Sequence, residues 1–588
     1  MKTLRILLLI VVVCTALKSN AEPVIYINQV AFDSNAPKIA VIGVDVKFDR
    51  NAVFTIVDAA SSIVEFSGKL SDAQELKDWA PGKIFYRANF SAVKTKGNYR
   101  LRLIAGGKSY SSGAFVIEDN ALANLTIPAI IHYYHKQRAD KPEEVAADKH
   151  VILFGSSNTV DVHGGWCDAS GDISKYFSHL AYANFMSPQQ IPLVTWSMEN
   201  TSESKQKLLT KLGVKDSLDS EAIWGADFIM RSLSKEDYFY ETIFSYFSKN
   251  PNDRRIVGLR ANSVTTDQYQ AAFREGGGMA IAALARISRW KKDGDFTSQQ
   301  YLDAAKHAFA HLLVNNTKYD DDGKENIIDD YCALMAATEL WIATDSSLYR
   351  DEARKRAHNL EKRISPGGYF ISDDGSRPFW HASDAGLPVV ALCRYLKKEN
   401  DQAQREAALN TVKTALLYTL RVTNDVSNPF GYARQTFRYQ NQIKEGFFIP
   451  HENETGWWWQ GEDARLSSLA TAATEGGKLA FPAGSKTRDS LAAFVSQQLS
   501  WILGCNPYNI CLMYGFGQKN VPYMHSMFGH GSEKGGISNG ITGKDGNPDG
   551  SGIDFKTEAE GNEWRWTEQW LPHAAWFLAA VTASTSGD

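Results

Sequence analysis

The sequence predicts a multidomain chain in which a small all-β, immunoglobulin-like sandwich precedes a large all-α barrel. Two observations support this fold class. Short runs of alternating apolar residues fill the chain from Val24 to Glu118, and from about residue 120 onward the apolar residues recur at helical spacing. The chain has 588 residues, 44% of them hydrophobic and 22% charged, so each part can bury a core of its own.

Residues 1–21 have the pattern of a secretory signal. Lys2 and Arg5 are followed by an apolar run from Ile6 to Ala16 that is too short to span a bilayer, and we expect cleavage after Ala21. No later segment is an unbroken apolar stretch of about 18 residues, the length a membrane span needs. We therefore expect an exported protein, periplasmic or extracellular, without a membrane span.

Residues 22–120 are predicted to form the sandwich. Strand-like runs such as IAVIGV, VFTIVD and NYRLRLI are separated by Asp, Asn, Gly, Pro and Ser. About seven short strands in roughly 95 residues are typical of an immunoglobulin-like domain, here without its disulfide. Because no row of exposed aromatic residues is evident, we expect this domain to brace the barrel and not to bind a ligand.

Residues 121–588 are predicted to form the barrel. Leu409, Val412, Leu416 and Leu420 illustrate the helical spacing, which recurs in roughly a dozen segments. So many helices, joined by polar and Gly-rich connections, favour a barrel of helical hairpins over a simple bundle. The connections include long ones, and long loops on a rigid scaffold often carry function.

Charge and cysteine content narrow the function classes. The net charge is −4 and no stretch is densely basic, which excludes nucleic acid as an expected partner. Five cysteines follow the signal segment, an odd number scattered through the chain, so we expect buried free thiols. A Cys505–Cys511 bridge is the alternative.

The first candidate catalytic motif is the segment His163-Gly-Gly-Trp-Cys-Asp-Ala-Ser-Gly-Asp172. Its glycines allow tight turns that aim Asp168 and Asp172 into one cavity. Neighbouring acids repel each other, so one would hold a water molecule while the other takes its proton. The alternative is that these aspartates cap a helix N-terminus. Trp166, within the motif, is expected to contact substrate.

The second motif is Trp564-Arg-Trp-Thr-Glu-Gln-Trp-Leu-Pro, where Pro572 predicts the start of a helix. Glu568 then lies at the helix start among four tryptophans, and burial against aromatic rings raises a carboxyl pKa, as a general acid requires. The alternative is a buried Glu568 that pairs with Arg565. Trp566 is expected to contact substrate.

Two further segments supply candidate binding residues. Three consecutive tryptophans follow His451, and they cannot all enter one helical core face, so we expect Trp458 to stack on sugar rings or other apolar ligands. The alternative is that they anchor a loop. His525 follows a Gly-rich turn and is expected to face a ligand.

Metal binding is only weakly indicated. Asp545-Gly-Asn-Pro-Asp549 begins like a calcium loop, but Pro548 and Lys556 interrupt the pattern. We expect a structural calcium ion at most, no metal in the catalytic site and no required cofactor.

In this order the motifs resemble those of glycoside hydrolase family 9 with an N-terminal immunoglobulin-like domain. The resemblance covers nearly all of the mature chain. It includes Asp161-Val-His-Gly-Gly-Trp-Cys-Asp168, Trp224-Gly-Ala-Asp-Phe228, Gly504-Cys-Asn-Pro507 and Tyr514-Gly-Phe-Gly517. It implies an (α/α)6 barrel that hydrolyses β-linked glycans, usually β-1,4-glucans, with inversion.

The resemblance also implies roles for the three acids. Asp172 corresponds to the base, Asp168 to the acid that helps to hold the water, and Glu568 to the general acid, with Glu563 as its competitor. The chain departs from the family where Ser170 is inserted and where Ser526 follows His525 in place of an arginine. We therefore expect a β-glucan or a hemicellulose such as xyloglucan, or their oligosaccharides, as substrate, and a monomeric enzyme.

Two alternatives belong to other function classes. A non-catalytic glycan-binding protein of the same fold would not need all three acids. A polysaccharide lyase would use a tyrosine or histidine base on a uronic acid and would need a basic groove, which the net charge of −4 does not favour.

Overall fold

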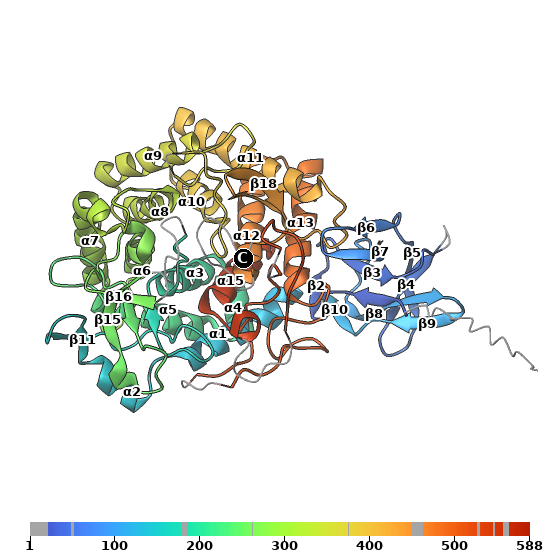
Figure 1. Ribbon diagram of the computed structural model, residues 1–588, viewed down its shortest axis with the longest axis horizontal. Coiled ribbons are helices and arrows are strands. Elements are labelled where there is room, and N and C mark those ends of the chain that lie inside the picture. Colours follow the sequence, from blue (N-terminus) through green and yellow to red (C-terminus); the bar gives the residue numbers. More distant parts are fainter. Residues whose placement is uncertain are drawn as a thin grey trace, which may run out of the picture.

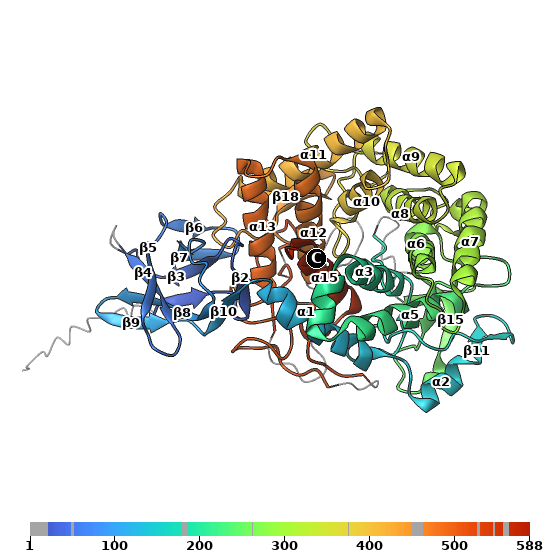
Figure 2. The ribbon, with the colours of Figure 1, turned by 180° about the vertical axis from the view of Figure 1, so that it is seen from behind.

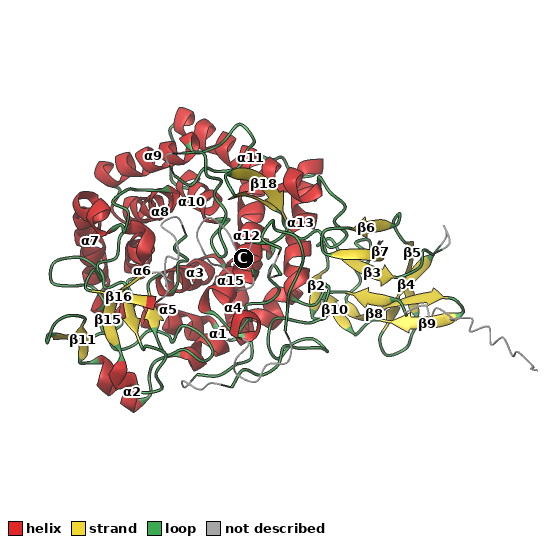
Figure 3. Cartoon of the chain, viewed as in Figure 1, coloured by secondary structure: helices red, strands yellow, loops and turns green. Residues whose placement is uncertain are grey.

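The computed structural model describes residues 22–48, 52–178, 186–260, 263–373, 375–449, 462–525, 530–544, 547–556 and 564–587. Within these ranges a β-sandwich lies beside a ring of helices, as Figures 1 and 3 show and Figure 2 shows from behind. The last strand of the sandwich ends at Glu118, and the first helix begins at Ala121. The predicted fold class, a sandwich followed by an all-α barrel, is confirmed.

The sandwich consists of two sheets with strand orders β1-β3-β7-β6 and β2-β10-β8-β4-β5, and β9 pairs with β8. Tyr99, Leu101 and Leu103 of β8 point into the core, and the residues between them lie nearer the surface, as alternation predicts. The strands are β1 (Val24–Tyr26), β2 (Ala31–Asp33), β3 (Ile39–Val44), β4 (Val53–Asp58), β5 (Val64–Lys69), β6 (Gln74–Leu76), β7 (Ala80–Asn89), β8 (Gly97–Ala105), β9 (Lys108–Ser111) and β10 (Phe115–Glu118).

Six helices of the described chain form a closed inner ring, in which each packs against the next and the last packs against the first. Every residue of helix α6 (Gly278–Ile287) is buried, as expected for a helix with neighbours on all sides. The inner helices are α3 (Ile191–Ser204), α6 (Gly278–Ile287), α8 (Ile327–Thr344), α10 (Leu387–Leu396), α12 (Asp463–Ala480) and α15 (Leu571–Ser584).

Six further helices of the described ranges lie outside this ring and turn part of their surface toward it. In the outer helix Ser347–Lys362, for example, Tyr349, Ala353 and Ala357 face inward. None of the helices in these ranges combines the length and apolar character that crossing a membrane demands. The outer helices are α1 (Ala121–Gln137), α5 (Lys215–Arg231), α7 (Ser298–Tyr319), α9 (Ser347–Lys362), α11 (Gln402–Asn424) and α13 (Lys486–Ile502), and the connections contain α2 (Pro142–Asp148), α4 (Gln206–Leu212), α14 (Trp564–Thr567), η1 (Pro251–Asp253), η3 (Phe273–Gly277) and η4 (Ser288–Trp290).

The connections also contain strands, whereas the sequence pattern indicated only helices here. These strands have between 2 and 6 residues, too few for alternation to stand out beside helical spacing. They form a sheet of order β12-β11-β15-β14-β13, with β16 beside β15, and a β17-β18 hairpin. Their bounds are β11 (Val151–Leu153), β12 (Thr159–Val160), β13 (Lys175–Tyr176), β14 (Thr242–Phe244), β15 (Arg255–Arg260), β16 (Val264–Thr266), β17 (Gln435–Tyr439) and β18 (Gln442–Gly446).

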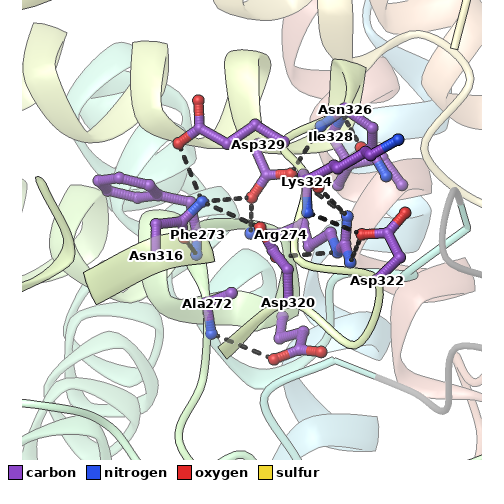
Figure 4. A network of polar contacts seen from close by, with 12 residues as sticks. Ala272, Phe273, Arg274, Asn316, Asp320, Asp322, Lys324, Asn326, Ile328 and Asp329 are labelled. Atoms are coloured by element: carbon purple, nitrogen blue, oxygen red, sulfur yellow. Dashed lines mark hydrogen bonds and ion pairs between the residues drawn. The ribbon is translucent and has the colours of Figure 1, made fainter. Parts of the chain in front are cut away.

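Buried ion pairs fix the N-terminal ends of the inner helices α6 and α8. The fully buried Arg274, in the turn before α6, lies 3.1 Å from Asp320 and 3.6 Å from Asp329 (Figure 4). It also donates a hydrogen bond to the Lys324 carbonyl at 3.0 Å, so one guanidinium joins this turn to the α7–α8 connection. This end of the ring also carries the motifs that the sequence singled out.

The sandwich and the barrel share a hydrophobic core. Trp79 packs edge-on against Trp501 and Phe448, with ring centroids 6.1 Å apart in both pairs. Gln29 is held on both sides of its amide, because it donates to the Asn509 carbonyl at 2.9 Å and accepts from the Gln518 amide at 2.9 Å. These contacts fix the sandwich against helix α13 and the loop that follows it.

Candidate active site

The first predicted motif forms a loop that leads into β13 at the N-terminal end of the inner ring. Gly165 and Gly171 have φ angles of 70° and 109°, in the region that favours glycine. At Gly165 an added Cβ would also lie 2.8 Å from the Phe228 ring. The two turns fold the loop back on itself, and the Asp168 amide donates to the Ser174 carbonyl at 2.9 Å.

Asp168 connects this loop to the last inner helix. Its buried carboxylate accepts a hydrogen bond of 3.1 Å from the indole N–H of Trp570, the residue that precedes α15. Burial, and then the charges of Asp172 and Glu568, raise the pKa of Asp168 well above its usual range. The first predicted acid therefore lies close to the other two.

Asp172 is surrounded by hydrogen-bond donors. It accepts from the Ser174 amide at 2.8 Å, the Tyr176 hydroxyl at 3.2 Å and the Ser245 hydroxyl at 3.1 Å. The Ser174 amide can only donate, whereas the two hydroxyls can donate or accept hydrogen bonds. All three contacts fix the direction in which the Asp172 oxygens point.

Glu568 lies between α14 and α15, at the start of the last inner helix. The Asn539 side-chain amide donates to its carboxylate at 3.4 Å, and the Asn539 backbone amide donates to its carbonyl at 2.8 Å. Burial, and then the charge of Asp172, raise the pKa of Glu568 to about 8. This carboxyl group is therefore protonated at neutral pH.

The three acids form one electrostatic cluster at the end of the ring. Closely spaced carboxyl groups cannot all ionise, so the cluster keeps at least one proton at neutral pH. Glu568 holds a proton to donate, while Asp172 is held by three hydrogen-bonding partners. One protonated and one ionised carboxyl group are the pair that general acid and base catalysis requires.

The inserted Ser170 binds the loop of the aspartates to the segment of Glu568. Its hydroxyl accepts from the Gln569 amide at 2.8 Å, and its own amide donates to the Gln569 carbonyl at 2.9 Å. The Gln569 side chain is fixed in turn, because it accepts from the Glu533 amide at 2.7 Å and donates to the Glu533 carbonyl at 3.0 Å. The two halves of the cluster are thus joined by direct hydrogen bonds.

Two of the tryptophans predicted to contact substrate lie in the interior instead. Trp166 is 0% exposed, and its indole N–H donates to Glu221 at 3.2 Å. Trp566 is also buried, and the Lys556 ammonium covers its ring at 4.7 Å. A buried ring offers no open face to a substrate, so these positions do not agree with the predicted contacts. The Trp166 ring packs edge-on against Tyr134 instead.

The other two residues predicted to bind substrate are His525 and Trp458. His525 is exposed and packs edge-on against Tyr523 at 5.0 Å, while Met524, between them, contacts the Ser170 hydroxyl at 3.6 Å. His525 therefore lies one residue from a contact with the loop that carries Asp168 and Asp172, the candidate catalytic loop. Trp458 and Glu563 lie outside the described residues, and the predictions for them remain open.

A group of potential metal ligands lies behind the catalytic loop. The ligand atoms of Glu144, Cys167 and His530 lie within 4.8 Å of one another. The Arg254 guanidinium contacts two of them, Glu144 at 2.9 Å and Cys167 at 3.8 Å, so a protein cation already pairs with part of this group. Asp545, which opens the possible calcium loop, lies outside the described residues, so that prediction stays open.

Sequence reasoning missed several residues that hold the acids. Ser245 lies 73 positions from Asp172 and belongs to no recognisable motif, and Asn539 lies 29 positions from Glu568. Only folding brings them together, so no local pattern could reveal them. Trp570 could have been predicted from the sequence, because it lies in the same aromatic motif as Glu568.

Comparison with protein families gives two matches. Residues 126–551 match the model of glycosyl hydrolase family 9, and residues 20–108 match the cellulase N-terminal ig-like domain. A xyloglucan-specific endo-β-1,4-glucanase of Bacteroides ovatus is 24% identical over 547 residues, which cover 85% of this chain and 82% of that protein. A cellodextrinase of Butyrivibrio fibrisolvens is 24% identical and covers 85% and 86%.

Solved structures share the whole architecture. A metagenome-derived family 9 endoglucanase superposes with a TM-score of 0.66 at 17% identity, covering 96% of this chain and 99% of the other. A family 9 protein of Bacteroides ovatus gives a TM-score of 0.64 at 19% identity, covering 95% and 98%. Likeness at this level of identity concerns the fold, and both parts of the fold are shared.

Proposed function

Because this chain belongs to glycosyl hydrolase family 9 and is an O-glycosyl hydrolase, we propose that it cleaves β-linked glucans, with xyloglucan or its oligosaccharides as the preferred class. The names of the two relatives, a xyloglucan-specific endoglucanase and a cellodextrinase, support this substrate class. The observation that carries the proposal is the pairing of Glu568, with a pKa of about 8, and Asp172, held by three donors.

In the proposed mechanism Glu568 is the general acid and Asp172 the general base. Glu568 gives its proton to the glycosidic oxygen as the bond between that oxygen and the anomeric carbon breaks. A water molecule, oriented with the help of Asp168, attacks the anomeric carbon from the opposite face and loses a proton to Asp172. This route inverts the configuration and implies carboxyl groups roughly 6.5–9.5 Å apart, with room for the water. Carboxyl groups and water suffice, so the reaction needs no cofactor.

We also propose that the protein is exported and acts as a monomer in the periplasm or outside the cell. The charged and apolar pattern of residues 1–21 supports export. N-terminal sequencing of the protein from the exported fraction tests this, and a start at Met1 contradicts it.

Sugar release from a panel of polysaccharides tests the activity. Wild type, Asp172→Asn and Glu568→Gln are assayed on xyloglucan, soluble β-glucans, mannan, xylan and short oligosaccharides. We expect release from xyloglucan or a β-glucan, and a loss of roughly 10²–10⁴-fold in both variants, because each removes a proton-transfer group. Glu65→Gln, on the exposed face of the sandwich, is the matched control and should keep full activity.

Three other results would change the assignment. Binding of a glycan without cleavage by wild type identifies a binding protein. Products that absorb in the ultraviolet, as unsaturated uronic acids do, identify a lyase. Activity that survives in Glu568→Gln and disappears in Glu563→Gln moves the general acid to Glu563.

A further inference from the structure

Two aromatic residues, Tyr246 and Phe247, follow directly on Ser245, whose hydroxyl donates to Asp172. Tyr246 is 42% exposed and Phe247 is 51% exposed. Other consecutive apolar residues exposed in the described chain are aliphatic, whereas these two are aromatic and follow the serine that contacts the candidate base. The contacts given above for Asp168, Asp172 and Glu568 do not involve Tyr246 or Phe247.

The backbone of the pair is strained. Tyr246 and Phe247 have φ angles of 55° and 56°, in the left-handed region that bulky side chains rarely adopt. The Phe247 amide donates to the Ser245 hydroxyl at 3.1 Å, and that hydroxyl also donates to Asp172 at 3.1 Å. One hydroxyl therefore fixes both the strained turn and the base. Strain of this kind concentrates at sites that bind ligands.

A buried ring supports the exposed pair from below. Phe244 is 1% exposed, and its ring centroid lies 4.8 Å from that of Tyr246 and 5.2 Å from that of Phe247. It belongs to a buried cluster with Tyr176 and Val257, and the Tyr176 hydroxyl donates to Asp172. The two exposed rings therefore pack on the same buried cluster that supplies the Tyr176 hydroxyl to Asp172.

Tyr246 also lines an open hollow of about 470 Å³ beside β11 and β15, the sheet shown in Figure 1. Phe154 adds a second aromatic side chain to its wall, while Asp253 and Arg255 add charged groups. A sugar ring has an apolar face of C–H groups and a rim of hydroxyls. An aromatic wall with polar groups at its edge matches both.

We propose that Tyr246 and Phe247 form a sugar-binding subsite, on which a glucose-type ring of the substrate chain stacks next to the ring held at the three acids. The ligand class is a β-linked gluco-oligosaccharide long enough to reach from the acids to the aromatic pair. This subsite rests on the proposed glycan hydrolysis and adds to it a determinant of substrate length.

The test compares variants that differ only in the flat ring. Tyr246→Leu and Phe247→Leu keep an apolar cover over Phe244, whereas Tyr246→Phe and Phe247→Tyr keep the ring. Leu348→Ala, an exposed apolar residue on α9, is the control for surface truncation. The kcat and KM values are measured on β-gluco-oligosaccharides of increasing length, and direct binding of the longest is measured by calorimetry.

We expect the leucine variants to raise KM about tenfold on long oligosaccharides, as loss of one covering aromatic face implies, and to match wild type on the shortest cleaved one. The ring-keeping variants and Leu348→Ala should match wild type at every length. Unchanged KM and binding in both leucine variants would overturn the subsite, as would an equal loss at every length.

The subsite and the hydrolase activity can fail separately. If wild type cleaves no glycan, the proposed function fails, and calorimetry still decides whether the leucine variants bind the oligosaccharide more weakly. If the leucine variants do not fold, Tyr246→Gln and Phe247→Gln replace them, because a polar side chain is tolerated at exposed positions.

Discussion

Glu568 and Asp172 are carboxyl groups of similar intrinsic acidity that the fold places in different surroundings. Asp172 faces a backbone amide and two hydroxyls, whereas the half-buried Glu568 has one side-chain donor among the described residues, the Asn539 amide, and its carboxyl group is withdrawn from water. Donors favour a charged carboxylate and burial disfavours it. In the proposed mechanism this difference supplies a base and an acid at the same pH, which two carboxyl groups in water could not do.

The pH dependence of kcat should follow from the protonation of Glu568. Burial and the charge of Asp172 raise its pKa to about 8, so the proton it must donate is present below that pH and lost above it. We expect kcat on the cleaved glycan to fall as pH rises through about 8. A profile that keeps its full rate at pH 10, measured within the range where circular dichroism shows a folded protein, contradicts Glu568 as the acid.

Ser170 should act as a positioning residue. In Ser170→Ala the Gln569 amide loses its acceptor, and the link between the aspartate loop and the Glu568 segment weakens. We expect kcat to fall about tenfold with KM unchanged, because misplaced catalytic groups slow the chemical step. Ser170→Thr keeps the hydroxyl and should recover most of the rate. Equal activity in all three proteins would show that the hydroxyl does not position the acids.

Arg254, next to the start of β15, connects three elements behind the catalytic loop. Its guanidinium is buried and donates to the Ile173 carbonyl at 3.0 and 2.8 Å, to Asp148 at 2.8 Å and to Glu144 at 2.9 Å. Helix α2 and the segment after Asp172 therefore meet at one cation. Two contacts therefore hold the loop of Asp168 and Asp172. Arg254 connects it to α2 through charge, and Ser170 connects it to the Glu568 segment through hydrogen bonds.

Arg254→Met should destabilise the protein by about 3–5 kcal/mol, because it leaves Asp148 and Glu144 buried with one partner fewer. Burial alone would raise the pKa of Glu144, but His530 and Arg254 lower it to about 2. The stabilisation is therefore present above the unfolded pKa and lost as pH falls toward 2. Urea unfolding should show a wider gap from wild type at pH 7 than at pH 4.

The control for this comparison is Arg350→Met, which removes a more exposed arginine from α9 and should change stability little. A gap between Arg254→Met and wild type that is the same at both pH values would show that packing, and not charge, accounts for the loss.

At the level of elements, the sequence predicted what depends on local pattern. The helical segments and the sandwich were predicted from periodicity. The three acids were chosen from two short motifs, one rich in glycine and one just before a predicted helix start. The strand β14 and Ser245, the residue that follows it, were not predicted, because a strand of three residues is too short to show alternation. Trp166 was misjudged because its side chain direction depends on the positive φ of the preceding glycines, which the sequence permits but does not specify.

The shared core makes the sandwich and the barrel one cooperative unit. Trp79 of the sandwich lies among Phe430, Phe447, Phe448 and Trp501 of the barrel. The Arg87 guanidinium donates to the Asn428 and Pro429 carbonyls at 2.6 and 2.8 Å, which adds a polar contact beside this aromatic group. Such an interface resembles the interior of one domain.

Wild type should therefore unfold in a single calorimetric transition. Trp79→Ala should lower stability by roughly 3–5 kcal/mol, as large core truncations do, and should separate the melting of the two parts. Phe66→Ala, within the sandwich and away from the barrel, should lower the transition without splitting it. Two transitions in wild type would mean that the domains fold independently, and a sugar-binding role for the sandwich would then have to be tested.

The contact between Ser170 and Gln569 joins positions that are 399 residues apart. A ribosome adds about 5–20 residues per second, so it makes the base roughly 20–80 s before the acid. Throughout that interval the nascent chain carries Asp168 and Asp172 without the proton donor and without the helix that closes the ring. Hydrolytic activity therefore reports that synthesis has passed Glu568, and a chain released before α15 should be inactive however much of the barrel it contains.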